Sequence, residues 1–157
     1  MRIKARIIAL FLLLITSSAA LGDYVIGYDE TKSLFVNQTM VTYDRHHGTQ
    51  VEYIAKNGKS YLLYPGNETI VKGSWKLEKS ENPNVFNLCF KYPANTFNPA
   101  TGESGGNWEC QAAGFYLTVV TDHADGDVLK LSKASAAPFV LAKRKASLAS
   151  LIRKLPK

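Results

Sequence analysis

Cysteine and histidine are scarce in this chain of 157 residues, which has two cysteines and three histidines. No serine stands in a Gly-x-Ser-x-Gly context, where α/β-hydrolases hold their nucleophile. No internal repeat occurs, and no run of acids has the twelve-residue spacing of an EF-hand calcium loop. These absences leave no catalytic signature, and we predict a protein that is not an enzyme and uses no cofactor.

Long apolar runs are also missing, apart from one at the N-terminus. That run, Ile7 to Ile15, follows three basic residues and precedes small residues, which is the order found in secretory signal peptides. Its nine residues would form a helix of about 14 Å, well short of the roughly 30 Å core of a bilayer. We predict a signal peptide over residues 1–22, cleaved after Ala20 or Gly22. The protein would be exported to the periplasm or, alternatively, secreted, and the lack of a nearby cysteine argues against a lipid anchor.

The two cysteines, Cys89 and Cys110, are expected to form a disulfide, because an exported protein matures in an oxidising compartment. The chain-entropy model assigns about 3 kcal/mol to closing a loop of about 22 residues. A metal site would need further ligands near this spacing, and a catalytic thiol would leave the second cysteine unexplained.

Positive charge is concentrated at the two ends of the chain. The formal net charge is +6, but the region between the N-terminal leader and residue 141 holds ten basic residues and all thirteen acids. The body of the protein is therefore mildly acidic, and nothing in it suggests a nucleic-acid groove.

The central part of the chain has the pattern of short strands separated by tight turns. Asn57-Gly58 is the strongest hairpin signal, since both central residues of a type I′ turn need positive φ. Such a series favours an antiparallel meander that closes into a small barrel or sandwich, because closure removes exposed sheet edges. We predict a mainly β single domain over residues 23–133, lipocalin-like in outline. The expected strands are Thr39–Tyr43, Thr49–Ile54, Ser60–Tyr64, Thr69–Leu77, Val85–Tyr92, Trp108–Ala112, Phe115–Thr121 and Val128–Leu131, the last two joined by Ala124–Gly126.

The start of this domain and its first hairpin also carry local signals. Asp29 can cap a short helical turn from Glu30 to Phe35, where acids favour a helix N-terminus. Arg45 to Gly48 is typical of a turn.

The C-terminal region, residues 134–157, has the composition of a linker followed by a basic amphipathic helix. Between Phe139 and Leu155, five leucine and isoleucine residues recur at helical spacing, with lysine and arginine around them. Three interpretations stay open: the helix docks on its own domain, lies on an anionic membrane surface, or binds an acidic partner. The basic patch comprises Lys143, Arg144, Lys145, Arg153 and Lys154.

A long polar loop, Pro93–Asn107, lies between the two cysteines. Loops of this length are uncommon in a compact domain unless they are functional or disordered, and binding surfaces favour loops held on rigid scaffolds. Trp75 and Trp108 could form a stacking platform with Tyr53, Tyr61, Tyr64 and Tyr92, or fill the core. We expect Trp75 in the core and leave both interpretations open for Trp108. The candidate binding residues are Asn95, Phe97, Asn98, Glu103, Asn107 and Trp108.

The histidines do not fall at metal-ligand spacing. His46 and His47 follow Asp44, but neighbouring side chains on a strand point to opposite faces, and no cysteine or glutamate completes a ligand set. We interpret them as an exposed turn pair. The acids of Asp122–Asp127 are interpreted as a hairpin turn, and we predict no metal site.

Several of these features occur in the order of a known pattern. The features are Leu34, Thr39, Gly48, Tyr53, Asn57-Gly58, Gly73-Ser-Trp75, Cys89 and Cys110. This order resembles a family of small exported proteobacterial proteins of uncharacterised function that share a Gly-x-Trp…Cys…Cys pattern. The resemblance covers Leu34 to Cys110 and implies a periplasmic, β-rich domain without known catalytic residues.

Together these observations predict a non-enzymatic binding or interaction module whose ligand is an unknown protein or small molecule. One alternative is a lipocalin-like carrier of a small apolar or aromatic ligand. Another is peripheral contact with an anionic membrane through the C-terminal helix. A hydrolase or metalloenzyme would require His46, His47 or His123 to converge with acids.

Overall fold

The computed structural model describes residues 27–156, so the predicted signal peptide lies outside the described residues. Within this range the chain forms nine strands, three α-helices and one 3₁₀ helix. In chain order they are α1 (Tyr28–Ser33), β1 (Gln38–Asp44), β2 (Gly48–Ile54), β3 (Lys59–Leu63), β4 (Val71–Lys79), β5 (Phe86–Lys91), β6 (Phe97–Asn98), β7 (Glu103–Ser104), β8 (Glu109–Ala112), α2 (Ala113–Val119), β9 (Val120–Asp125), η1 (Leu131–Lys133) and α3 (Leu148–Ile152).

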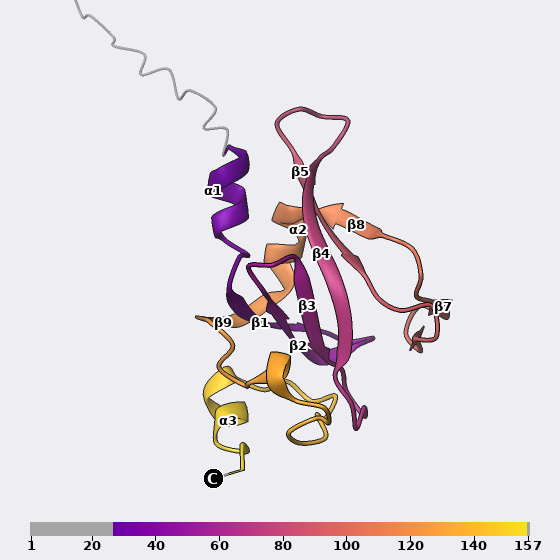
Figure 1. Cartoon of the computed structure of the whole chain (residues 1–157), viewed down its shortest axis with the longest axis vertical. Helices are drawn as coiled ribbons and strands as arrows, with labels where there is room; N and C mark the ends of the chain where they lie inside the picture. The colour runs from indigo at the N-terminus through magenta and orange to yellow at the C-terminus, as the bar shows by residue number, and fades with distance from the viewer. Residues whose placement is uncertain (1–26, 157) are drawn as a thin grey trace, which may run out of the picture.

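Seven of the strands form one antiparallel sheet in the order β8-β5-β4-β3-β2-β1-β9. The sheet curls into a half-barrel, and the two-residue strands β6 and β7 form a separate small hairpin to one side (Figure 1). The prediction of a mainly β, antiparallel fold is confirmed. None of the helices in the described part of the chain is long and apolar enough to cross a membrane.

The hairpin between β2 and β3 forms where Asn57-Gly58 predicted it, but with a different turn. Only Gly58 has a positive φ, at 77°, and its N–H donates to the carbonyl of Ala55 at 3.3 Å. This is a connection closed by one left-handed glycine, and the predicted type I′ turn is wrong. Asn57 contributes through its side chain instead, which accepts a hydrogen bond from the N–H of Lys59 at 3.2 Å.

Two hydrophobic clusters lie on opposite faces of the sheet. The inner face packs around α2, whose Tyr116 contacts the rings of Phe35 and Phe90 at 5.9 Å between centroids. Trp75 is buried in this inner cluster, as predicted, and its indole N–H donates to the carbonyl of Ala55 at 2.7 Å. The outer cluster combines strand residues with the C-terminal segment: Val41, Val51, Tyr53, Ala55, Leu63, Ile70, Leu129, Leu131, Leu141, Leu148 and Leu151.

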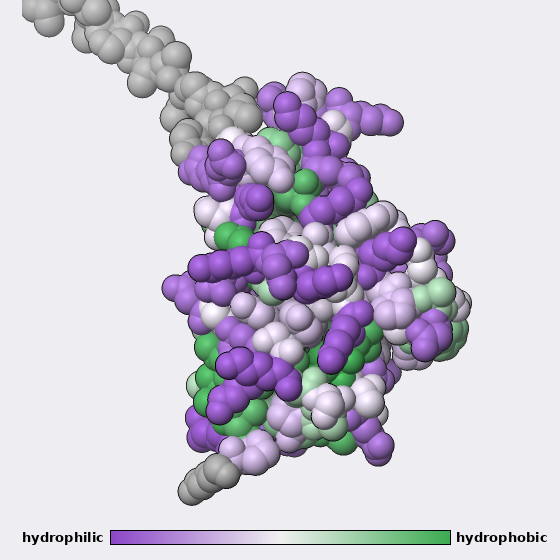
Figure 2. Space-filling view, viewed as in Figure 1, coloured by the Kyte–Doolittle hydropathy of each residue, from purple (hydrophilic) through white to green (hydrophobic). Residues whose placement is uncertain are grey.

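The C-terminal segment docks on the outer face of its own domain, which was one of the three open interpretations. The N–H of Thr49 donates to the carbonyl of Lys143 at 3.1 Å, and the N–H of Gly66 donates to the carbonyl of Leu141 at 2.9 Å. The N–H of Leu148 donates to Asp122 Oδ2 at 2.7 Å. Apolar residues show among polar ones in the lower part of the molecule, where this segment lies (Figures 1 and 2).

The predicted helix from Phe139 to Leu155 is wrong in its extent. Only Leu148–Ile152 is α-helical, and the Ser147 side chain caps it by accepting from the N–H of Ser150. The preceding residues do not join the helix, and the carbonyls of Leu141 and Lys143 accept hydrogen bonds from Gly66 and from Thr49 of β2 instead. The backbone at Lys143 lies close to the backbone of Gly48. A Cβ on Gly48 would lie 2.6 Å from the Lys143 carbonyl oxygen, so this approach needs glycine.

Two further strand predictions are wrong. The segment predicted as strand Phe115–Thr121 is mostly the helix α2, because Ala113 and Tyr116, three residues apart, pack together on the inner cluster. Val128–Leu131 forms no strand, because the Asp127 carboxylate accepts from the N–H groups of Leu131 and Ser132 and turns the chain into η1. The predicted hairpin turn at Ala124–Gly126 is likewise wrong, since β9 runs to Asp125.

Short elements at other positions also refine the expectations. The helical turn near Asp29 exists as α1, but its N-cap is Gly27 and Asp29 lies in its first turn. The polar loop Pro93–Asn107 contains the β6–β7 hairpin. Cys89 on β5 and Cys110 on β8 are partners in the strand register and form the predicted disulfide.

Candidate ligand-binding cavity

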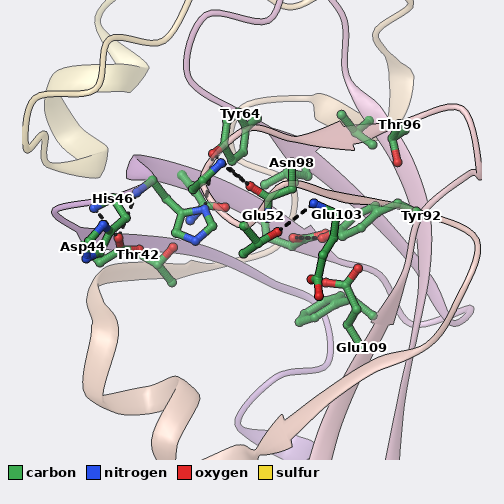
Figure 3. Close-up of a pocket in the computed structure, with 18 of the residues that line it drawn as sticks. Thr42, Asp44, His46, Glu52, Tyr64, Tyr92, Thr96, Asn98, Glu103 and Glu109 are labelled. Atoms are coloured by element: carbon green, nitrogen blue, oxygen red, sulfur yellow. Dashed lines mark hydrogen bonds between the residues drawn. The ribbon is translucent and has the colours of Figure 1, made fainter.

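A cavity of about 750 Å³ lies against the inner face of the half-barrel. Strands β1, β2 and β3 form one side, and β5, β8, α2 and the β6–β7 hairpin form the others. Its volume is in the range of small-molecule sites in proteins. Figure 3 draws 18 of the lining residues and labels ten of them, among them Glu52, Tyr64, Tyr92 and Asn98.

Aromatic rings from several elements are among the residues that line the cavity. β5 contributes Phe90, and α2 contributes Phe115 and Tyr116. Tyr92, just after β5, stacks on Phe90 with 6.3 Å between ring centroids. The β6–β7 hairpin adds Phe97, which is 65% exposed. A ligand in this space would therefore contact ring faces and edges on at least two sides.

Glu52 is a buried carboxyl among the residues that line the cavity. It lies on β2 and is 6% exposed, and its Oε2 accepts a hydrogen bond of 2.6 Å from the hydroxyl of Tyr92. The other oxygen, Oε1, is buried and has no hydrogen-bond partner among the described residues. Buried polar atoms are nearly always paired, so an unpaired one marks a place that needs an explanation.

Burial raises the pKa of Glu52 to about 7. The hydroxyls of Tyr92 and Ser60 oppose this by favouring the carboxylate, but they do not offset desolvation. Ser60 Oγ has no partner with hydrogen-bond geometry, so its opposing effect is the weaker one. Burial and the neighbouring Glu52 also raise the pKa of Tyr116 and of Tyr92, so both phenols stay protonated and Tyr92 stays a donor.

Gly73 on β4 makes room for this pair. A Cβ at this position would lie 2.7 Å from Tyr92 Cδ1 and 2.8 Å from Ser60 Oγ. The Tyr92 ring can thus lie close to the backbone of β4 and reach Glu52.

The histidine turn lies at the opposite end of the cavity. Asp44 Oδ1 accepts hydrogen bonds from the N–H groups of His46 and His47 at 2.7 and 2.8 Å, which fixes the predicted turn. His46 is exposed as predicted, whereas His47 is half-buried, so the prediction of an exposed pair is wrong for His47. The ring of His47 contacts the hydroxyl of Tyr64 at 3.2 Å, and that hydroxyl donates to Asn98 Oδ1 at 3.5 Å. His123 is not among the lining residues, so the three histidines do not converge on the cavity.

The loop Pro93–Asn107 forms one wall because it folds back on the end of β5. Gly105 N–H donates to the Thr96 carbonyl at 3.0 Å, and Gly106 N–H donates to the Tyr92 carbonyl at 2.9 Å. A Cβ on Gly105 would lie 2.3 Å from the Pro93 carbonyl oxygen, so this fold-back needs glycine.

The six predicted binding residues divide evenly. Phe97, Asn98 and Glu103 line the cavity, whereas the other three do not. Trp108 lies apart, with the ammonium of Lys76 4.7 Å from the centre of its ring. The three residues outside the cavity are Asn95, Asn107 and Trp108.

The predicted basic patch of the C-terminal segment is exposed and lies outside the cavity. Leu148 and Leu151, the apolar residues that a membrane-bound helix would insert, are buried in the outer cluster. Membrane contact through this segment stays a prediction. In this structure such contact would be made mainly by the exposed basic side chains of the segment. The exposed residues are Lys143, Arg144, Lys145, Arg153 and Lys154.

One group of potential metal ligands, Glu78, Cys89 and Cys110, comes together within residues 27–156. Both sulfurs of this group are bonded to each other in the disulfide. Neither is a thiolate, so the group does not offer the ligand set that zinc requires.

Sequence reasoning missed Glu52 and Glu109 as cavity residues. Glu52 stands at a polar position of a strand with polar–apolar alternation, a pattern that places it on the solvent side. Of the four tyrosines predicted for a stacking platform, Tyr64 and Tyr92 line the cavity, whereas Tyr53 and Tyr61 pack with the outer cluster. The signal that could have found this site is Gly73, since a glycine inside a strand often marks a close approach of another group.

Comparison with known proteins gives no match: no protein-family model, no curated protein and no solved structure is similar to this chain. The resemblance to exported proteobacterial proteins therefore stays a prediction.

Proposed function

We propose that this protein is an exported, non-enzymatic binding protein that holds a small ligand in the cavity on the inner face of its half-barrel. The observation that carries the proposal is a cavity of about 750 Å³ lined by a buried carboxyl with one unpaired oxygen. Ligand sites in proteins combine apolar surface with polar groups that fix the ligand, and aromatic rings such as those of Tyr92 and Tyr116 line the same cavity as Glu52.

The position of the loop Pro93–Asn107 supports a small ligand over a flat protein surface. Seven of its residues face the cavity, and its backbone is tied to the end of β5. A flat interaction surface would not need a hollow behind this loop. The proposal thus joins the two leading expectations, a binding loop and a carrier with an internal site, because the loop is one wall of the cavity.

Export is the cellular setting of this proposal. The charged and apolar N-terminal pattern of residues 1–22 supports a signal peptide. The disulfide is typical of an oxidising compartment. We propose the periplasm as the compartment, with secretion as the alternative.

Native mass spectrometry of the disulfide-bonded protein, purified from the cells that produce it, tests the function. The Gln50→Trp variant places a large ring on the inner face at the cavity, and Lys72→Trp places the same ring at an exposed position of β4. We expect a bound small molecule in the wild type and in Lys72→Trp, and its loss in Gln50→Trp. A small molecule retained equally by all three, or by none, would contradict the proposal.

The pKa of Glu52 favours a second candidate function, proton transfer to or from a bound substrate. A carboxyl with a pKa of about 7 is suited to act as a general base at neutral pH. The ligand recovered by native mass spectrometry would be incubated with the wild type and with Glu52→Gln. Conversion by the wild type alone would favour an enzyme, and recovery of unchanged ligand from both would reject it.

A further inference from the structure

We infer that the ligand of this cavity is an organic cation, an amine with an apolar body, whose ammonium group bonds to the carboxylate of Glu52. This inference rests on the proposed function, because it names the chemical class of the ligand at the same site. Charge, aromatic lining and hydrogen-bond capacity support it independently.

Acids outnumber bases in the lining. Four carboxyl side chains line the cavity, from the end of β1, from β2, from β7 and from β8, against two histidines, His46 and His47, and no lysine or arginine. The body of the protein holds ten lysine and arginine residues, so their absence from all 25 lining positions is informative. Such a lining attracts cations and repels anions. The four acids are Asp44, Glu52, Glu103 and Glu109.

The aromatic rings suit the same ligand. The face of an aromatic ring carries negative potential and attracts ammonium groups, most strongly where water is excluded. An apolar body attached to the ammonium would pack on the remaining ring surface. The rings that line the cavity are Tyr64, Phe90, Tyr92, Phe97, Phe115 and Tyr116.

Glu52 offers an acceptor, Oε1, that no donor of the described chain reaches with hydrogen-bond geometry, although the Ser60 hydroxyl lies near the carboxyl. Tyr92 satisfies Oε2, and Oε1 has no partner. An ammonium group brings up to three donors and the opposite charge, whereas a hydroxyl brings one donor and no charge. Because Oε1 is covered in this structure, a ligand reaches it only with a small movement of neighbouring side chains.

The groups that face Glu52 carry no positive charge that would compete with the ligand. They are the phenol of Tyr92 after β5, the phenol of Tyr116 on α2 and the hydroxyl of Ser60 on β3. On β1, the residue paired with Glu52 is Met40. An ammonium would therefore be the dominant influence on the carboxyl, and it would favour the ionised form. Binding near neutral pH would then release a proton.

Isothermal titration calorimetry at pH 7 with three compounds of one shape tests the inference: 2-phenylethylamine, 2-phenylethanol and phenylacetate. Titrations in two buffers with different ionisation enthalpies measure proton release. We expect the amine to bind roughly tenfold or more tightly than the alcohol or the acid, and to release protons. Glu52→Gln should weaken amine binding by about tenfold, and Glu81→Gln, an exposed acid outside the cavity, should leave it unchanged.

A double variant, Glu103→Gln with Glu109→Gln, covers the case in which Glu52→Gln does not fold. Both residues are exposed, and we expect the amine to bind this variant several-fold more weakly. Amine binding that is unchanged in these variants, equal binding of the alcohol, preferred binding of phenylacetate, or no binding of any compound would overturn the inference. The ligand search by native mass spectrometry tests the proposed function separately. A neutral or anionic ligand found there would support the proposed binding function and would contradict the inference that the ligand is a cation.

Discussion

Tyr92 donates a hydrogen bond of 2.6 Å to Glu52, although β3 and β4 separate the strands that position these residues. In a flat sheet, strands three spacings apart are roughly 14 Å from each other. The curl of the half-barrel shortens this distance on the inner face, and Gly73 leaves the space that the Tyr92 ring occupies. This contact therefore depends on the curvature of the sheet, and it joins two residues that line the cavity.

The buried Glu52 should make stability depend on pH. Its pKa is raised from 4.5 to about 7 in the folded protein. Below pH 4.5 the carboxyl is protonated in both states, and stability is at its fullest. Between pH 4.5 and pH 7 the carboxyl ionises in the unfolded chain but stays protonated in the folded protein, so the free energy of unfolding falls by about 3 kcal/mol and levels off once the folded carboxyl has ionised as well. Urea unfolding at pH 5 and pH 8 measures this loss.

Glu52→Gln should lose less stability between pH 5 and pH 8 than the wild type, because the amide does not titrate. Glu81→Gln changes an exposed acid and should keep the wild-type profile. Identical pH dependence in wild type and Glu52→Gln would show that Glu52 is not a buried titrating group.

Gly73→Ala should destabilise the protein by about 1–3 kcal/mol, the usual cost of adding a methyl group to a packed site. The new Cβ would meet the Tyr92 ring and Ser60 Oγ at less than 3 Å. Gly114→Ala is the matched control, since its Cβ meets nothing within 4 Å and the residue lies in α2, where alanine is favoured by about 0.5–1 kcal/mol. Thermal unfolding of both variants checks the prediction, and equal melting temperatures would refute it.

Leu151→Ala should destabilise the protein by about 2–5 kcal/mol, because it removes a fully buried side chain from the outer cluster. The neighbouring Ile152 is 41% exposed, so Ile152→Ala should have a much smaller effect. Chemical denaturation compares them. A tail that does not dock on the sheet would make the two substitutions equivalent.

Reduction of the Cys89–Cys110 disulfide should lower the free energy of unfolding by about 3 kcal/mol through the lost loop constraint. Urea unfolding with and without a reducing agent measures this difference. The double variant Cys89→Ala with Cys110→Ala is the control, because the reducing agent should not change its midpoint. An unchanged midpoint in the reduced wild type would contradict the prediction.

The strands and the disulfide could be predicted because their signals are local. Alternation marks β2, and the glycine at position 58 marks its hairpin. The helix α2 could not be predicted, since its β-branched and aromatic residues favour a strand and only the inner cluster makes a helix the better packing. Glu52 was missed because the C-terminal segment covers the outer face of β2. Both faces of this strand are therefore buried, and its polar positions do not mark the solvent side.

The measurement that tests the ligand site most directly is a ¹³C NMR titration of the Glu52 side-chain carboxyl, in the free protein and in protein saturated with 2-phenylethylamine. The account predicts a pKa of about 7 in the free protein, and a value lower by about one unit or more with the amine bound, because a nearby cation favours the carboxylate. A pKa near 4.5 in the free protein, or a pKa that saturation with the amine leaves unchanged, would contradict it.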